Sequence, residues 1–157
     1  MLLLLFILVI FFILHDILKI GDIMIEVRNY REEDLSFVNE ILFESFNIKK
    51  DNFTGDNFYE VVATIDNKVC GYLLLTKVLN PIKNKYYMLV DYVCVGSQFR
   101  NMGIGKKLME YAEGIAKNEK VMYLQLTCST FRKAGHKLYE SCGFIKRDSD
   151  IFRKEII

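Results

Sequence analysis

The sequence predicts one α/β (α+β) domain with a mixed, mostly antiparallel central sheet and helices on both faces. Runs rich in branched and aromatic residues predict strands, and two of them are joined at Asp66-Asn67-Lys68, a hairpin signal. After this hairpin, strands alternate with segments whose apolar residues recur at helical spacing. One strand, ending at Val95, passes through a glycine-containing turn directly into such a helix. Helices that alternate with strands in this way pack on the faces of the sheet.

The first part of the domain is expected to contain a strand at 25–29 and a helix at 32–45. The acidic run Glu32-Glu33-Asp34 suits the positive N-terminal end of that helix. Further strands are expected at 58–65 and 69–78. Pro81 marks the break before the strand 86–95. One face of the helix 32–45 is apolar, formed by Leu35, Val38, Ile41 and Leu42.

The second part is expected to hold a helix at 103–118, a strand at 121–127 and a helix at 131–141. Gly143 suits the C-cap of the last helix, because glycine adopts the left-handed conformation without strain. Short strands are expected at 144–147 and 151–155. The helix 103–118 has one apolar side, formed by Ile104, Leu108, Ala112 and Ile115.

Composition excludes several classes of function. A length of 157 residues, of which 52% are hydrophobic, suits one domain with a sizeable core. The net charge of +1, without a long basic run, gives no indication of nucleic-acid binding. The 4 cysteines lack metal-ligand spacing and the chain has only 2 histidines, so no metal site is expected. Buried thiols in a reducing compartment are the plain interpretation.

Residues 1–23 are expected to lie outside the domain, which spans 24–157. Residues 1–14 form an unbroken apolar run, shorter than the roughly 20 residues of a typical membrane-spanning helix. No charged segment precedes this run and no small-residue cleavage site follows, as a signal peptide would require. Two interpretations stay open: a transmembrane anchor, or a true start at Met24. With an anchor, Lys19, Arg28 and Arg31 would hold the domain in the cytosol by the positive-inside rule.

The turn between the strand ending at Val95 and the next helix predicts a phosphate-binding site. It reads Arg100-Asn101-Met102-Gly103-Ile104-Gly105 and is followed by Lys106 and Lys107. At a helix start, backbone N–H groups lack intrahelical partners and point outward at the positive end of the helix dipole. The turn matches neither the Walker loop, which needs G-x-x-x-x-G-K-[ST], nor the dinucleotide pattern, because Leu108 replaces its third glycine.

The remaining pattern, R-x-x-G-x-G preceded by V-x-V, resembles the acetyl-CoA signature of the GNAT superfamily of N-acetyltransferases. A second segment, Arg132 to Phe144 (RKAGHKLYESCGF), resembles the family's downstream pattern R-x-x-A-H-x-F-Y-E-x-x-G-F. Gly135 and Leu138 are mild departures from it. The resemblance covers 24–157 and implies the GNAT fold, with acetyl-CoA as co-substrate and no metal.

The resemblance also implies which residues act on the acetyl group. Tyr139 matches the tyrosine that protonates the leaving thiolate, and its ordinary pKa of about 10 keeps it protonated at neutral pH. Asp91 lies at an acidic position of the strand 86–95 and is expected to take the amine proton through an ordered water. Strand alternation predicts Asp91, Val93 and Val95 on one face. A core tyrosine and a solvated aspartate are the structural alternatives for these two residues.

The same resemblance implies contacts with CoA along one continuous segment. Main-chain groups of Val93, Cys94 and Val95 would bind the pantetheine arm, with the N–H of Val95 facing the oxyanion. Arg132 would touch the CoA arm. The structural alternative is that Arg132 is a solvated arginine at a helix start, without a binding role. The pyrophosphate would lie on the turn formed by Arg100, Asn101, Met102, Gly103, Ile104, Gly105 and Lys106. His136 matches a family residue but is interpreted as structural.

The predicted function is acetyl transfer from acetyl-CoA to a primary amine by direct attack in a ternary complex. The alternatives are a CoA-binding sensor without turnover and transfer of another acyl group. The loops 46–57 and 147–150 carry Asp51, Asp56, Asp148 and Asp150 and so weakly favour a cationic acceptor, a small amine or a peptide N-terminus. The expected location is the cytoplasm, free or tethered to the membrane by residues 1–23, and a homodimer is left open.

A chain beginning at Met24 tests the domain boundary. It is expected to be soluble, to unfold cooperatively and to bind CoA as the full chain does, because the composition changes at Gly21-Asp22 and a strand follows Met24. Circular dichroism with thermal unfolding and titration calorimetry measure these properties. Loss of cooperative unfolding would make residues 1–23 part of the core.

Overall fold

The computed structural model describes residues 24–53 and 55–156. The predicted N-terminal segment 1–23 lies outside these residues, and its two interpretations both stay open. Within the described ranges, no helix combines the length and apolar character that a membrane crossing requires.

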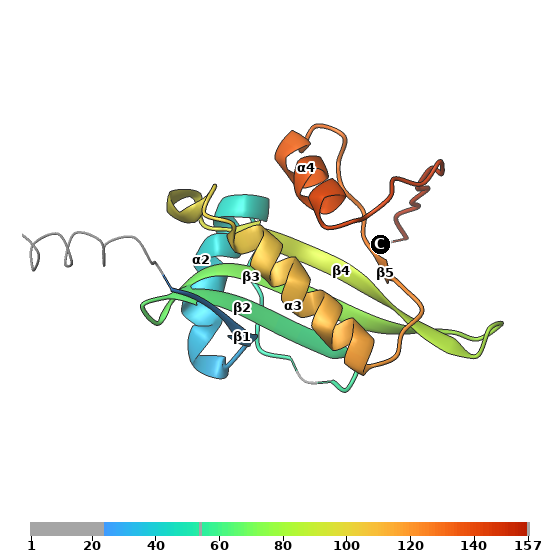
Figure 1. Ribbon diagram of the computed structural model, residues 1–157, viewed down its shortest axis with the longest axis horizontal. Helices are drawn as coiled ribbons and strands as arrows, with labels where there is room; N and C mark the ends of the chain where they lie inside the picture. The colour runs from blue at the N-terminus through green and yellow to red at the C-terminus, as the bar shows by residue number, and fades with distance from the viewer. Residues whose placement is uncertain (1–23, 54, 157) are drawn as a thin grey trace, which may run out of the picture.

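A five-stranded sheet with strand order β1-β2-β3-β4-β5 forms the centre of the domain (Figure 1). The strands from β1 to β4 pair antiparallel with their neighbours, and β4 pairs with β5 in parallel. The prediction of a mixed, mostly antiparallel sheet is therefore confirmed. The strands are β1 (Ile25–Asn29), β2 (Phe58–Ile65), β3 (Lys68–Asn80), β4 (Lys85–Val95) and β5 (Leu124–Gln125).

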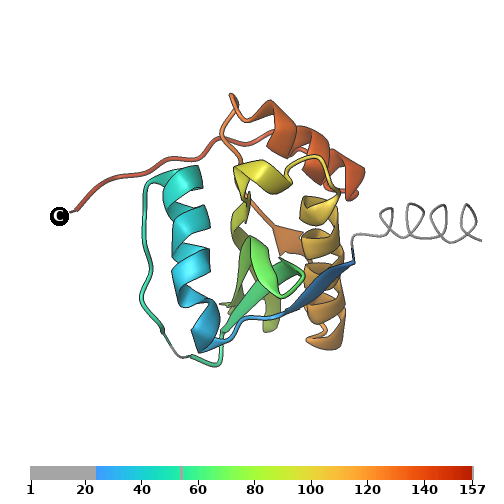
Figure 2. The same cartoon turned by 90° about the vertical axis from the view of Figure 1, so that its left-hand side faces the viewer.

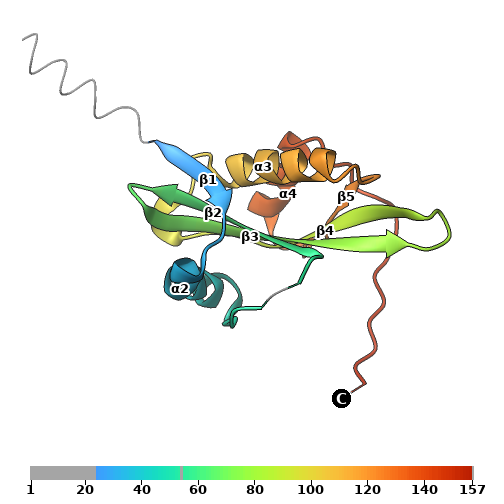
Figure 3. The same cartoon turned by 90° about the horizontal axis from the view of Figure 1, so that it is seen from below.

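Helices cover both faces of this sheet, as predicted. Helix α2 packs on one face, whereas α3 and α4 lie on the opposite side (Figures 2 and 3). Two short 3-10 helices precede α2 and α3. In chain order these elements are η1 (Glu32–Asp34), α2 (Leu35–Phe46), η2 (Ser97–Phe99), α3 (Ile104–Asn118) and α4 (Lys133–Ser141).

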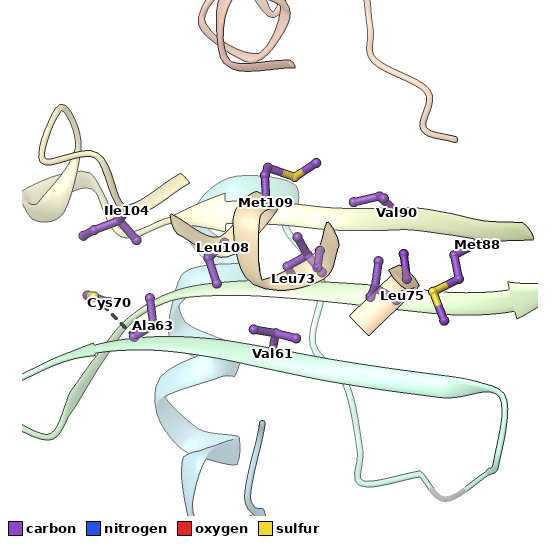
Figure 4. Packing of buried hydrophobic residues seen from close by; sticks show 12 residues of the cluster. Val61, Ala63, Cys70, Leu73, Leu75, Met88, Val90, Ile104, Leu108 and Met109 are labelled. Carbon is purple, nitrogen blue, oxygen red and sulfur yellow. Dashed lines mark hydrogen bonds between the residues drawn. The ribbon is translucent and has the colours of Figure 1, made fainter. Parts of the chain in front are cut away.

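The larger core cluster lies between α3 and the sheet, and Figure 4 shows its side chains. Ile104 and Leu108 of α3 are almost fully buried there against residues of β2, β3 and β4. Gly71 of β3 makes this close packing possible. A Cβ at Gly71 would come within 2.9 Å of Ile104 Cγ2 and 3.0 Å of Leu108 Cδ1. The start of α3, and with it the turn that precedes it, is therefore fixed on the sheet.

The second core cluster lies under α2 and includes Val38, Leu42, Tyr72 and Cys94. A partly buried ion pair holds the start of α2 against β1, because Arg28 donates to both carboxylate oxygens of Asp34 at 2.7 and 2.9 Å. Burial alone would raise the pKa of Asp34, but the bonds from Arg28 and from the N–H of Arg31 lower it.

Several predicted elements are shorter or absent. The helix expected at 32–45 begins as η1, and the strand expected at 121–127 is reduced to β5 because β4 pairs with it only at Met88↔Leu124 and Leu89↔Gln125. No strand forms within 142–156, so the strands predicted at 144–147 and 151–155 are wrong. Ile145 and Phe152 are 84% and 92% exposed, and no neighbouring strand among the described residues pairs with this segment.

Candidate active site

The turn before α3 presents free backbone donors at the start of a helix. Asn101 and Gly103 both have left-handed backbone conformations, with φ of 63° and 79°. The N–H of Lys107 makes a helical bond to the Gly103 carbonyl at 3.1 Å, so the N–H groups of the preceding helical residues lack intrahelical acceptors. No side chain caps this N-terminus, and its first turn has no acidic residue.

The charges around this turn suit an anion. Lys106 and Arg100 flank it with side chains that are 59% and 55% exposed. Exposed cations and an uncapped helix start both favour negative charge at this end of α3. The turn therefore has the properties of a phosphate site. The pyrophosphate contacts of Arg100, Asn101, Met102, Gly103, Ile104, Gly105 and Lys106 stay a prediction.

Two glycines of the turn act differently. A Cβ at Gly103 would meet no atom within 4 Å, so its positive φ is the constraint. A Cβ at Gly105 would lie 3.0 Å from Leu138 Cδ2 in α4. Gly105 thus lets α4 approach α3, which the phosphate pattern alone did not predict.

A β-bulge interrupts β4 just before the turn. Leu74 of β3 pairs with Asp91, and Tyr72 pairs with Cys94, so two β4 residues, Tyr92 and Val93, lie opposite one β3 residue. Tyr92 adopts a left-handed conformation with φ of 51°. The extra residue reverses the alternation of side chains along the strand.

This reversal corrects the prediction that Asp91, Val93 and Val95 share one face. Val93 and Val95 pack against the α3-side core. Asp91 instead lies opposite Leu74, which packs in the cluster under α2. Strand alternation applies only up to the bulge. The thiol of Cys94 is buried on the α2 side, and burial raises its pKa to about 12.

The bulge also determines which way the backbone of β4 points. The N–H of Gly96 donates to Cys70 O of β3 at 3.0 Å. Alternation therefore directs the N–H of Val95 away from β3, toward the side where β5 lies farther along the sheet. Since β5 pairs with β4 only as far as Leu89, this donor faces the gap between the two strands. That direction suits the predicted oxyanion contact.

A cavity of about 230 Å³ lies where β4 and the chain after β5 separate. It brings together four of the predicted site residues, Tyr139, Asp91, Val93 and Arg132. Five residues that the sequence reasoning did not assign to the site also line it, namely Val90, Tyr92, Thr127, Cys128 and Ser129. Phe46, which the sequence analysis placed at the start of the loop 46–57, completes the wall on the α2 side.

The two predicted catalytic residues have shifted pKa values. Burial, with a smaller contribution from nearby Cys128, raises the pKa of Tyr139 to about 12. Burial also raises the pKa of Asp91. Tyr139 is therefore protonated over the physiological pH range, and Asp91 is a stronger base than an exposed aspartate.

Arg132 joins the two sides of the cavity. Its guanidinium stacks on the Phe46 ring at 4.5 Å from the ring centroid, and its Nη2 donates to Ser45 O at 3.4 Å. Phe46 also contacts Tyr92 edge-to-face, with ring centroids 5.6 Å apart. His136 Nε2 lies 3.1 Å from Ser129 O, a contact that fits its interpretation as a structural residue.

Comparison with known families decides the identity of this fold. A family model described as Acetyltransferase (GNAT) family matches residues 25–144. The chain belongs to the GNAT family of acetyltransferases. This match confirms the predicted resemblance. Members of the family use acetyl-CoA as co-substrate. A search of curated proteins found no match.

Solved structures agree with the fold at low sequence identity. An aminoglycoside acetyltransferase from an uncultured soil metagenomic sample superimposes with TM-score 0.73 at 17% identity, covering 85% of this chain and 96% of that one. A ribosomal-protein-alanine N-acetyltransferase from Brucella melitensis gives 0.72 at 17% identity, covering 85% and 99%. A transcriptional regulator from Bacillus halodurans gives 0.73 at 20% identity, covering 85% and 100%. These similarities establish the fold.

Gly103→Val tests the turn of this GNAT domain. A branched side chain is strained at φ of 79°, so the turn should deform and CoA affinity should fall at least about tenfold, measured by titration calorimetry. Gly114→Ala in α3 is the matched control, because a Cβ there meets no atom within 4 Å. It should leave CoA binding unchanged and stabilise the helix slightly. Unchanged affinity in folded Gly103→Val would remove the turn from the binding site.

Proposed function

We propose that the chain is an acetyl-CoA-dependent N-acetyltransferase that transfers the acetyl group directly to a primary amine in a ternary complex. The observation that carries the proposal is the placement of two features at one end of β4. An uncapped, basic helix start follows this end of the strand, and the cavity with Tyr139 and Asp91 lies beside it. A CoA pyrophosphate on the turn would direct its thioester along β4 toward the cavity.

The turn and the cavity would bind different parts of acetyl-CoA. Backbone N–H groups from Gly103 to Lys106 would hold the pyrophosphate, and main-chain groups of Val93, Cys94 and Val95 would hold the pantetheine arm. The guanidinium of Arg132 lies within the same cavity and can reach the arm near the thioester. The N–H of Val95, free of β3, would donate to the carbonyl oxygen as it gains charge.

The reaction then needs two proton transfers. The amine nitrogen attacks the acetyl carbon, and a new C–N bond replaces the C–S bond. Asp91 accepts the proton that the amine loses, through a water molecule, and Tyr139 donates a proton to the departing thiolate. Before the next turnover, Asp91 releases its proton to solvent and Tyr139 takes up a proton from solvent. The free amide and free CoA thiol are the products.

The acceptor would enter from the side of α2. Phe46 and Tyr92 form the aromatic part of that wall, and Asp91 is its carboxylate. Aromatic rings and a carboxylate favour a cationic amine, either a small molecule or a peptide N-terminus. A screen of amines that measures thiol release from acetyl-CoA tests this. Absence of transfer to every amine, with CoA binding retained, would instead favour the CoA-binding sensor.

Tyr139→Phe tests the proposed acid. The ring packs beside Phe144, with centroids 6.1 Å apart, and phenylalanine preserves this packing while removing the hydroxyl. We expect kcat to fall about 100-fold with little change in CoA affinity, the result for an interaction made in the transition state. Steady-state kinetics and calorimetry separate the two effects. Full activity in the variant would make Tyr139 a structural residue.

Asp91→Asn tests the proposed base through the pH dependence of kcat. In the unchanged protein, activity should fall as the pH drops through the raised pKa of Asp91, because the protonated carboxyl cannot accept a proton. The variant should lose this decline and react about 10- to 100-fold more slowly at neutral pH. Ionisation of the acceptor affects both proteins equally. Identical pH profiles and rates would exclude Asp91 as the base.

A further inference from the structure

Glu44, in the last turn of α2, holds the segment that leads into the CoA turn. Its carboxylate accepts the backbone N–H of Ser97, with Oε1 and Oε2 at 3.1 and 3.2 Å. The same carboxylate lies 3.4 Å from Nη2 of Arg100. Ser97 and Arg100 are the residues that open and follow η2, so one side chain of α2 contacts both ends of this short helix.

The bond from Ser97 satisfies a donor that the local chain leaves free. Gly96, the N-cap of η2, has no side chain to accept the first N–H of the helix. Glu44 supplies the acceptor from a distant element, as an anionic cap. Hydrogen bonds from Ser97 lower the pKa of Glu44, and the charge of Arg100 adds to the effect, so the cap is ionised at neutral pH.

The next two residues of α2 reach the catalytic cavity. Ser45 O accepts the bond from Arg132, and the Phe46 ring stacks under the same guanidinium. The helix ends directly afterward, at Asn47 with φ of 56°. One turn of α2 therefore contacts the CoA turn through Glu44 and the cavity wall through Ser45 and Phe46.

We propose that Glu44 is a positioning residue that fixes the pyrophosphate turn relative to the acetyl-transfer cavity. The inference deepens the proposed function and rests on CoA binding at that turn. The short helix η2 connects the end of β4 to the turn. When Glu44 caps the first N–H of η2, it therefore fixes the position of the turn relative to the strand. Contact with Glu44 holds the Arg100 side chain beside the turn.

Electrostatics alone predicts the opposite effect. A carboxylate near a phosphate site repels the ligand, so removal of the charge should strengthen CoA binding. A positioning role predicts weaker binding when the cap is lost. It also predicts retained binding when a neutral acceptor replaces the carboxylate. Glu44→Ala and Glu44→Gln separate the two cases, since the glutamine carbonyl can still accept the N–H of Ser97.

The experiment uses the full chain and measures CoA binding by calorimetry and the KM for acetyl-CoA. We expect Glu44→Ala to weaken CoA binding about tenfold and Glu44→Gln to stay within about threefold of the unchanged protein. Glu40→Ala is the matched control. It removes a carboxylate one turn earlier on α2, and within the described residues Glu40 makes no ion pair or side-chain hydrogen bond. Its affinity should be unchanged.

A second variant removes the donor instead of the acceptor. Ser97→Pro deletes the N–H, and proline is tolerated at a helix start, after a Gly96 already in an extended conformation with ψ of 140°. It should weaken CoA binding as Glu44→Ala does, and the double variant should be no weaker than either. Ser97→Ala keeps the N–H and removes only the hydroxyl, which also contacts Glu44, so it should weaken CoA binding much less than Ser97→Pro. If Glu44→Ala fails to fold, the two Ser97 variants still test whether the bond between Ser97 and Glu44 positions the turn for CoA.

Three results would overturn the inference. One is unchanged or tighter CoA binding in folded Glu44→Ala, and another is equal effects of Ser97→Pro and Ser97→Ala. The third is additive loss in the double variant. Failure of the proposed acetyl transfer gives a different result, namely no transfer to any amine while the unchanged protein still binds CoA, and it leaves the role of Glu44 standing. Absence of CoA binding in the unchanged protein would overturn both proposals.

Discussion

The bulge in β4 determines the geometry of the site. One additional residue opposite β3 turns the side chain of Asp91 to the α2 side and keeps Val93 and Val95 on the α3 side. The same residue directs the N–H of Val95 away from β3 and accompanies the separation of β4 from β5. Strain at Tyr92, whose φ is 51°, is tolerated because the surrounding sheet fixes the strand on both sides of it.

Two helix ends lie near this strand on opposite faces of the sheet (Figures 2 and 3). The N-terminus of α3 offers backbone donors and positive charge to an anion, whereas the C-terminus of α2 offers carbonyl groups and Glu44. Arg132 satisfies one of these terminal carbonyls through its bond to Ser45 O, which suits the negative end of the α2 dipole. The charge pattern of the site therefore follows largely from how the two helices are placed on the sheet.

Local sequence patterns predicted the parts of the fold that depend on nearby residues. The hairpin at Asp66-Asn67 forms with positive φ at both residues, and the turn at Gly103 starts α3 as expected. Tyr139, Asp91, Val93 and Arg132 were named from the sequence, and they line one cavity. The bulge was not predictable from alternation, because a single inserted residue leaves the apolar run of β4 unchanged.

Features that depend on distant neighbours were missed. The strands expected after Phe144 need a partner along the free edge of β5, and β5 itself extends only where β4 stays close. Gly105 belongs to a phosphate pattern in sequence, yet its lack of a side chain also accommodates Leu138 of α4. No sequence motif indicated a role for Glu44, because its partner is the backbone N–H of Ser97, 53 residues away.

The order of the strands has a consequence for how the domain folds. Strands β1 to β4 are neighbours in both sequence and space, although the α2 segment separates the first two, and β3 and β4 join through a short hairpin. The β4–β5 pair instead requires the chain to cross over through α3, and it contains two register positions. Pairing of distant segments is slower, because the loop must close before contacts form. We therefore expect the half of the cavity that follows β5 to assemble late and to open first in partial unfolding, and a ligand that contacts both halves to suppress that opening.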